Sequence, residues 1–214
     1  MSPLLTPRKL PRQARAHATH DAIVEAATHI IAKGGLAAFN TNAVAERAGV
    51  SIGSLYQYFP NKDALMVTLI LRQQQTQLAN VQAALAAFED IDFEAAVRLL
   101  VRAAMQHHRD DVLLATALDH EEARLPLSDM LSEYLDQGGV MLAPLFYRYR
   151  DSIGAINPAR AMRTIPVLVK AAVDCWANTN PPELNIAEDE AVRAVLGYLS
   201  SANAAKPSEN ATVG

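Results

Sequence analysis

The feature that most constrains the fold is the segment from Asn40 to Leu65, which contains two short helical patterns on either side of Gly49. The first pattern begins at the start of this segment, and Ser51 can cap the second, which Pro60 closes. Gly49 suits the tight turn between them because glycine adopts a positive φ without steric cost. Two helices of about eight residues joined by such a turn predict a helix-turn-helix unit.

The second of these helices has one apolar side and one side of small or polar residues. Leu55 and Phe59 are four residues apart and can pack inward on Val44. An independent amphipathic helix would more often carry Lys and Glu on its outer side. A surface of small, hydrogen-bonding residues suits a helix that enters the major groove of DNA, where it allows a close approach to bases and phosphates. The expected outer residues are Gly53, Ser54, Gln57 and Tyr58, with Tyr56 at the flank.

Helical patterns also flank this segment. Residues 19–33 predict a first helix, capped by Thr19 and stopped by Gly34-Gly35. Asn61 can cap a long helix over residues 62–88. Further helices are expected near residues 93–109, 112–124, 128–150, 158–178 and 188–202. In the third of these Gly138-Gly139 and Pro144 predict a kink or break, and Pro166 predicts the same in the fourth.

The expected fold class is therefore all-α: an N-terminal three-helix helix-turn-helix domain over residues 17–62, then a larger helical domain over residues 63–205. Three prolines among basic residues predict a flexible basic arm over residues 1–16, and residues 206–214 are expected to be a disordered tail. Scarce glycine and only 6% aromatic residues agree with helices rather than sheets.

Charge is divided unevenly along the chain. Residues 1–62 contain seven Lys/Arg and three Asp/Glu, whereas residues 63–214 contain twelve and twenty, so the net charge of −4 is the sum of +4 and −8. This asymmetry fits a basic nucleic-acid-contacting module on an acidic domain. The single cysteine, Cys175, excludes an intrachain disulfide and a multi-cysteine zinc site. No signal peptide or membrane-spanning stretch is visible, which predicts a cytoplasmic protein without membrane contact.

The segment NTNAVAERAGVSIGSLYQYFPNKDAL resembles the signature of the TetR/AcrR family of transcriptional regulators. Its matching elements are Val44-Ala45, Ala-Gly-Val-Ser, Gly-Ser-Leu-Tyr, an aromatic residue before Phe59, and Asn-Lys-Asp at the start of the next helix; IVEAA…GG…F matches the family's first helix. The resemblance covers residues 19–68. It implies a helix-turn-helix DNA-binding domain followed by a ligand-binding and dimerisation domain.

The resemblance also implies a set of DNA-contacting residues. Thr41 would hydrogen-bond a phosphate, Asn42 could reach a base edge, and Gln57 is the candidate for direct base readout. Lys62 lies in the first turn of a helix, where its positive charge opposes the helix macrodipole at a cost of about 0.3 kcal/mol. A bound phosphate would reverse that effect, and only Asp63 could compensate it locally. The full expected set is Thr41, Asn42, Ser51, Ile52, Gly53, Ser54, Tyr56, Gln57, Tyr58 and Lys62.

Two positions depart from the family pattern. Ile52 stands where the family often has a basic or polar residue, so it would touch a thymine methyl or pack beside Leu55. Tyr58 stands where histidine is commonest, which keeps a hydrogen-bond donor but not a titratable charge. Both changes concern the operator sequence that the protein would read.

The second domain offers few chemical motifs. His107-His108 and the residues around Asp119 invite a metal hypothesis, but adjacent helical residues point about 100° apart, and no Glu-x-x-His pair occurs. We therefore expect no metal and no cofactor, and interpret these residues as solvated faces or as the lining of a ligand cavity. The run from Thr164 to Asn180 carries only two charges, so a second subunit is expected to bury it.

The family resemblance implies a ligand-responsive repressor, not an enzyme. It would bind a near-palindromic double-stranded operator as a homodimer formed through its last two long helices, and a small-molecule effector would control it. Two alternatives stay open at this stage. One is a helical enzyme or metalloprotein with a purely structural helix-turn-helix, and the other is an adaptor that acts through protein contacts.

Overall fold

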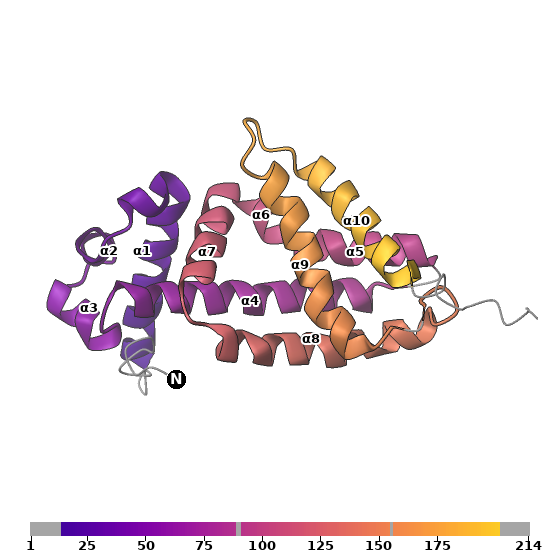
Figure 1. Ribbon diagram of the computed structural model, residues 1–214. Helices are drawn as coiled ribbons and strands as arrows, with labels where there is room; N and C mark the ends of the chain where they lie inside the picture. Colours follow the sequence, from indigo (N-terminus) through magenta and orange to yellow (C-terminus); the bar gives the residue numbers. More distant parts are fainter. Residues whose placement is uncertain (1–13, 89–90, 155, 202–214) are drawn as a thin grey trace, which may run out of the picture. The chain divides into compact units, whose positions relative to one another are not determined.

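The computed structural model describes residues 14–88, 91–154 and 156–201. Within these residues the chain forms α-helices and no strand, which confirms the all-α fold class (Figure 1). The helices are α1 (Ala14–Ala38), α2 (Thr41–Arg47), α3 (Ile52–Tyr58), α4 (Lys62–Ala86), α5 (Phe93–Ala104), α6 (Gln106–Asp110), α7 (Val112–Arg124), α8 (Ser128–Arg148), α9 (Pro158–Trp176) and α10 (Leu184–Ser201).

The chain folds as two compact units, each of which contains two separate stretches of the sequence. The first unit contains the chain up to Gln77 together with Gln106–Leu131, and the second contains Leu78–Met105 and the chain from Ser132 onward. Thus α6 and α7 belong with the N-terminal helices rather than with the rest of the expected second domain. The expected basic arm lies outside the described residues except for its last three positions, which form the start of α1. The expected tail, residues 206–214, also lies outside them.

Helix α1 begins earlier than expected and contains Thr19, so the interpretation of Thr19 as its cap is wrong. The expected stop at the glycine pair appears as a kink, because Gly35 has a φ of 63° while helical structure resumes beyond it. Only glycine adopts this backbone conformation without strain. The helix therefore changes direction at Gly35 and continues to Ala38, from which the chain enters α2.

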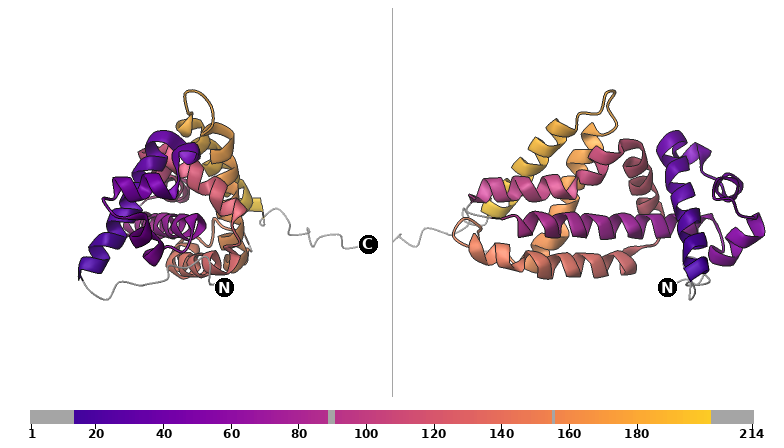
Figure 2. Two further views of the ribbon diagram at one scale, coloured as in Figure 1. Left: turned by 90° about the vertical axis from the view of Figure 1, so that its left-hand side faces the viewer. Right: turned by 180° about the vertical axis from the view of Figure 1, so that it is seen from behind.

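The hydrophobic core of the first unit gathers large side chains from α1, α2, α3, α4 and α7. Phe59, Leu55 and Ile23 are completely buried in it, and Leu118 of α7 joins the same cluster. Figures 1 and 2 show α7 alongside α1. This packing fixes the positions of the short helices α2 and α3, which could not bury enough surface by themselves to remain folded.

Two helices of the structure differ from the expected ones through packing. One helix was expected over residues 93–109, but the structure has α5 and α6 with a break at Met105. No glycine or proline marks this break; the side chain of Met105 is completely buried, which indicates that packing ends α5 there. Conversely, α8 runs without interruption through Gly138-Gly139 and Pro144, so of the expected kink or break the break does not occur. A Cβ on Gly138 would lie 3.4 Å from Met162 of α9, so this glycine permits close helix packing.

In the second unit α9 and α10 lie side by side, and α10 also packs on α5 (Figures 1 and 2). Helix α9 continues through Pro166, and α10 begins four residues before the expected position, at Leu184. Glu188 of α10 is buried, and Arg102 of α5 donates to it over 2.8 Å. None of the helices in the described ranges is long and apolar enough to span a lipid bilayer.

Candidate nucleic-acid interface

The two short helices are held in place by caps that the sequence predicts. The Asn40 side chain accepts from the Ala43 backbone N–H over 2.9 Å, and the Ser51 hydroxyl accepts from the Ser54 N–H over 3.0 Å. Between the helices Gly49 has a φ of 67°, as the tight turn requires. An N-cap contributes about 1 kcal/mol, which matters for helices of only seven residues each.

The inner and outer sides of α3 are arranged as expected. Leu55 and Phe59 are fully buried, whereas Gly53 and Gln57 are exposed on the other side. Ile52 is 38% exposed and therefore presents part of its apolar side chain to the outside. All seven residues of α3 are uncharged. Its outer surface is thus small, polar and accessible, with an amide at Gln57 and hydroxyls at its start.

Hydroxyl groups from α2 and α3 meet beside this surface. Thr41, the first residue of α2, places its Oγ1 3.1 Å from the hydroxyl of Tyr56, which is 41% exposed. Ser51 and Ser54 form a second pair, with 2.8 Å between their hydroxyl oxygens. Each pair shares one hydrogen bond and so keeps one O–H to donate outward. Sequence reasoning identified these residues but not their pairing, because residues 41 and 56 belong to different helices.

Tyr58 differs from the expectation that it would lie on the outer surface. It is half-buried, and its ring lies edge-on to the imidazole of His20 with centroids 6.4 Å apart. The reason is that the last turn of α3 lies against α1, where His20 also approaches the ring of Phe59 at 5.2 Å. Tyr58 therefore contributes to the packing of α3 on α1.

Lys62 is exposed at the start of α4, and its Nζ lies 4.9 Å from the centroid of the Phe39 ring. This cation–π contact offsets part of the unfavourable helix-dipole interaction, and sequence reasoning missed it. Asp63, the compensating group that the sequence suggested, forms an ion pair with Arg124 of α7. Hydrogen bonds to Glu121 and Asp63 raise the pKa of Arg124, so this guanidinium stays cationic while it connects α7 to the start of α4.

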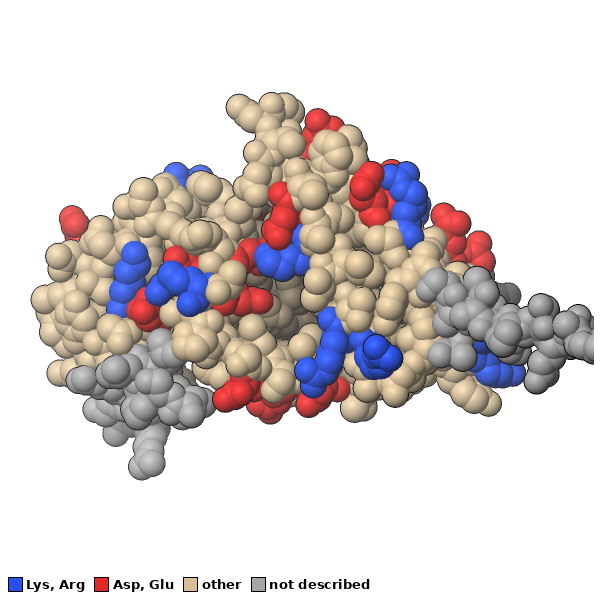
Figure 3. Space-filling model, viewed as in Figure 1, with Lys and Arg blue, Asp and Glu red and all other residues tan. Residues whose placement is uncertain are grey.

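Acidic and basic side chains lie on different parts of the described surface. Asp and Glu gather along the outer edge of α8 in Figure 3, in agreement with the exposed Asp129, Glu133 and Asp136 of that helix. Exposed basic side chains flank α3 in sequence, at Arg47 in the last turn of α2 and at Lys62. An uncharged α3 between two cations is compatible with a polyanionic partner, whereas the acidic edge of α8 would repel one.

One group of possible metal ligands occurs in the described part of the chain: His107, His108 and Asp119. Although adjacent helical residues point about 100° apart, the rings of His107 and His108 lie close together, with centroids 4.2 Å apart. Two rotatable side-chain bonds allow imidazoles to converge even where the Cα–Cβ bonds diverge. None of these three residues belongs to the surface around α3.

These elements define a two-domain helix-turn-helix protein. It has a kinked first helix and two short capped helices, and a longer helical region follows them in the sequence. Residues 23–69 match the family described as "Bacterial regulatory proteins, tetR family", and residues 92–199 match "Tetracyclin repressor-like, C-terminal domain". Because the second match alone covers half of the 214 residues, the chain belongs to the TetR family of bacterial regulatory proteins.

Two curated relatives are described as the HTH-type transcriptional repressor KstR. The protein from Rhodococcus jostii is 45% identical over 51 residues, covering 24% of each chain. The protein from Mycolicibacterium smegmatis is 47% identical over 51 residues, covering 24% of this chain and 25% of its own. The chain thus spans about a quarter of the length of the curated relatives that it matches.

Solved structures share the fold over most of the chain. The fatty acid degradation regulator FadR from Bacillus halodurans has a TM-score of 0.65 and 21% identity, covering 83% of this chain and 98% of its own. The regulator LfrR from Mycobacterium smegmatis, in complex with proflavine, has a TM-score of 0.57 and 22% identity, covering 89% and 98%. At this identity the similarity establishes the all-helical fold that the two proteins share with this chain.

Proposed function

We propose that this protein is a sequence-specific DNA-binding transcriptional repressor that binds a near-palindromic operator as a homodimer and responds to a small molecule. The observation that carries the proposal is the exposed, uncharged outer side of α3, which caps and a buried inner side hold in place. The family of the chain and the repressor relatives of its N-terminal segment support the same function.

The proposed contacts to DNA follow from the exposure and chemistry of each side chain. Gln57 would read a base edge in the major groove, and Ile52 would touch a thymine methyl. The hydroxyl pair of Thr41 and Tyr56 would donate to one phosphate, and Lys62 to another. The proposed set is the one expected from the sequence apart from Tyr58, whose ring packs against α1: Thr41, Asn42, Ser51, Ile52, Gly53, Ser54, Tyr56, Gln57 and Lys62.

The proposed homodimer forms through α9 and α10. Val167 of α9 is 64% exposed in the single chain, although it belongs to the run with only two charged residues. A two-fold axis through this face would relate two copies of α3, which would then enter major grooves about 34–36 Å apart along the duplex. The two-fold symmetry of such an assembly explains why the operator would be near-palindromic.

The proposed small-molecule effector would act by binding the DNA-competent and DNA-incompetent states with different affinities. The LfrR structure with proflavine provides an example of a small molecule held by a protein of this fold. Binding that did not distinguish the two states would leave DNA affinity unchanged, however tight it was.

Selection from random duplex DNA, followed by fluorescence anisotropy on the selected site, tests the proposal. Lys62→Ala should weaken binding to all sequences alike and reduce the slope of log affinity against log salt by roughly 2 per dimer, because one phosphate contact is lost in each subunit. Lys33→Ala removes an exposed lysine from α1 and serves as the matched control. It should leave the slope within about 0.5 of wild type.

Gln57→Ala should change the base preference at one position in each half-site, with a loss of about 1–3 kcal/mol in discrimination. Repeating the selection with this variant measures that change. Gln75→Ala, at an exposed glutamine of α4, is the matched control and should select the same sequence as wild type. Selection of no consensus by the wild-type protein would contradict the proposed function.

A further inference from the structure

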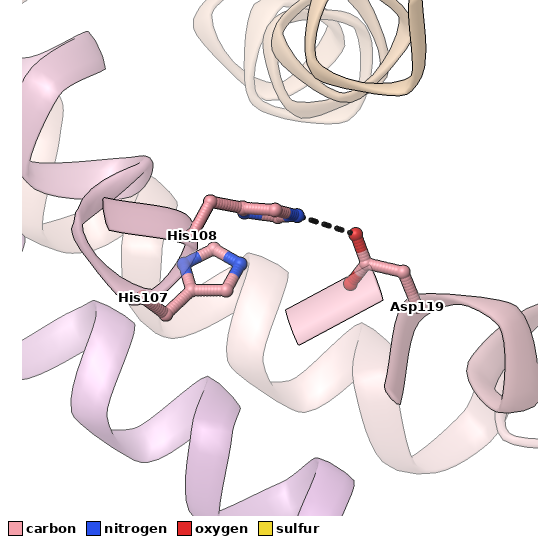
Figure 4. A group of neighbouring side chains, drawn as sticks. All are labelled: His107, His108 and Asp119. Atoms are coloured by element: carbon pink, nitrogen blue, oxygen red, sulfur yellow. Dashed lines mark ion pairs between the residues drawn. The ribbon is translucent and has the colours of Figure 1, made fainter. Parts of the chain in front are cut away.

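We propose that His107, His108 and Asp119 form a binding site for one divalent transition-metal ion, held between α6 and α7. The three side chains each offer one ligand atom, and these atoms all lie within 4.8 Å of one another. Figure 4 shows both imidazoles and the carboxylate facing a common space, with the histidines on one helix and Asp119 on the next. This site is distinct from the surface around α3 and goes beyond the proposed function.

The distances suit metal coordination with little rearrangement. Nε2 of His108 and Oδ2 of Asp119 are 3.2 Å apart. A tetrahedral ion with bonds of about 2.0–2.2 Å to nitrogen and oxygen holds its ligands about 3.4 Å from one another. His108 and Asp119 therefore already have nearly the separation required. The separations that involve His107 stay within 4.8 Å, and two rotatable side-chain bonds connect its ring to the backbone.

Burial distinguishes this group from an ordinary surface cluster. His108 is 3% exposed, and its other ring nitrogen, Nδ1, is buried without a hydrogen-bond partner. The Oγ1 of Thr116, three residues before Asp119 on the same face of α7, is likewise buried without one. A buried polar group that stays unsatisfied destabilises the fold, so such groups are uncommon outside sites with a function.

The side chain of Gln77 can orient His107, which is the less buried histidine of the group. The amide nitrogen of Gln77, on α4, lies 3.0 Å from both ring nitrogens of His107. Because a 180° rotation exchanges the amide's donor and acceptor, Gln77 can also accept from the ring N–H of His107. Partners of this kind fix the tautomer and orientation of histidine ligands in metal sites.

The ligand set determines the class of metal. Two imidazoles and one carboxylate favour zinc, cobalt, nickel or ferrous ions over calcium and magnesium, which prefer oxygen ligands. Three protein ligands also leave a coordination position for water or for a donor atom of a small molecule. The site therefore fits a Zn²⁺-class ion that keeps one exchangeable position.

Its place in the fold suggests a regulatory consequence, which rests on the proposed function. Leu118, directly before Asp119, is buried in the same core as Ile23 of α1 and Phe59 at the end of α3. Metal binding would fix α6 to α7 and thereby favour one packing of α7 on α1. We propose that this changes the affinity for operator DNA, because α1 supports α3.

Titration of the full-length, tag-free protein with Co²⁺ tests the site directly, without DNA. We expect saturable visible absorption at one ion per chain, its displacement by Zn²⁺, and an increase in melting temperature with either ion. His107→Gln and Asp119→Asn should each weaken metal binding at least about tenfold, because changes even outside the ligand shell cost about 10–100-fold.

His120→Gln is the matched control, since it removes an exposed histidine adjacent to Asp119 and should leave the metal affinity unchanged. Far-UV circular dichroism confirms that each variant is folded, and His107 and Asp119 are chosen because they are only half-buried. Absence of stoichiometric Co²⁺ and Zn²⁺ binding by wild type would overturn the proposal. So would equal binding by the folded His107→Gln and Asp119→Asn variants.

Operator binding with and without Zn²⁺ then tests the regulatory consequence. We expect the dissociation constant to change at least fivefold for wild type and for His120→Gln, but not for His107→Gln. Stoichiometric metal binding with unchanged DNA affinity would overturn the regulatory part alone. Failure of the proposed function is distinguishable, because the protein would then select no DNA sequence although it still bound Co²⁺.

Discussion

The two units of the molecule bury their apolar residues to very different extents. Among the described residues, the largest fully buried side chains all belong to the first unit except Met105. The second unit instead leaves large apolar side chains outside, with Val140 78%, Tyr147 74% and Val167 64% exposed. The first unit is therefore complete as a single chain, whereas the second has the surface of a protein that another molecule completes. This difference supports the proposed dimer.

The largest expected effect on the free energy of unfolding distinguishes a buried aromatic residue of the first unit from an exposed one of the second. Phe59→Ala should reduce the free energy of unfolding by about 3–5 kcal/mol, because it empties a fully buried position in the first unit. Tyr147→Ala, at an exposed position of the second unit, should change it by less than about 0.5 kcal/mol at low protein concentration. Urea unfolding followed by circular dichroism measures both. Equal losses would mean that Tyr147 is packed within the single chain, which would contradict the comparison.

The next effect concerns the exposed apolar surface itself. Val167→Glu should weaken the dimer by about 2 kcal/mol, or roughly thirtyfold, because it buries a charge at the proposed interface of each subunit. Sedimentation equilibrium measures the dissociation constant. Gln82→Glu adds the same charge at an exposed site on α4 and should leave it unchanged. A monomeric wild-type protein would show that something other than a second copy covers this face.

A smaller effect concerns the buried carboxylate of the second unit. Arg102→Met leaves Glu188, which is 3% exposed, without its closest cation and should cost about 1–2 kcal/mol. The value is moderate because the Arg102 side chain is 56% exposed, so solvent already screens the pair. The double variant Arg102→Met/Glu188→Gln should recover most of the loss. Thermal unfolding of the three variants tests this, and no recovery would show that Arg102 contributes by packing.

The smallest effect is expected at the exposed pair of Arg98 and Asp189. The hydrogen bond from Arg98 lowers the pKa of Asp189 below its ordinary value of 3.8. A lowered pKa contributes stability above the unfolded value, and this contribution is lost as the pH falls through the folded value. Asp189→Asn should therefore lower the melting temperature slightly at pH 7, and the difference from wild type should shrink as the pH falls below 3.8. A difference between the proteins that grows toward acid would contradict this assignment.

The N-terminal helices could be predicted closely because local chemistry determines them. Asn40, Ser51 and Asn61 cap their helices through their own side chains, and Gly49 adopts the positive φ that ends α2. Each of these signals lies within three or four residues of the feature that it sets. Accordingly, α3 begins directly after its expected cap Ser51, and α4 begins at the expected Lys62.

The remaining errors concern features that distant residues determine. Met105 ends α5 through its burial, and Gly138 permits close packing on Met162 rather than interrupting α8. At the site, the sequence could not show that Phe39 lies beneath Lys62 or that Tyr58 packs against α1. These contacts join residues from different helices, so no pattern within one helix reports them.

Photocrosslinking at position 57 tests the central claim, that the outer side of α3 enters the DNA groove, most directly. A benzophenone amino acid would replace Gln57 in one protein and Gln82, on α4, in another, each bound to the selected operator and irradiated. The account predicts crosslinks to operator bases from position 57 and none from position 82. Crosslinking at position 57 no stronger than at position 82, with DNA still bound, would contradict it.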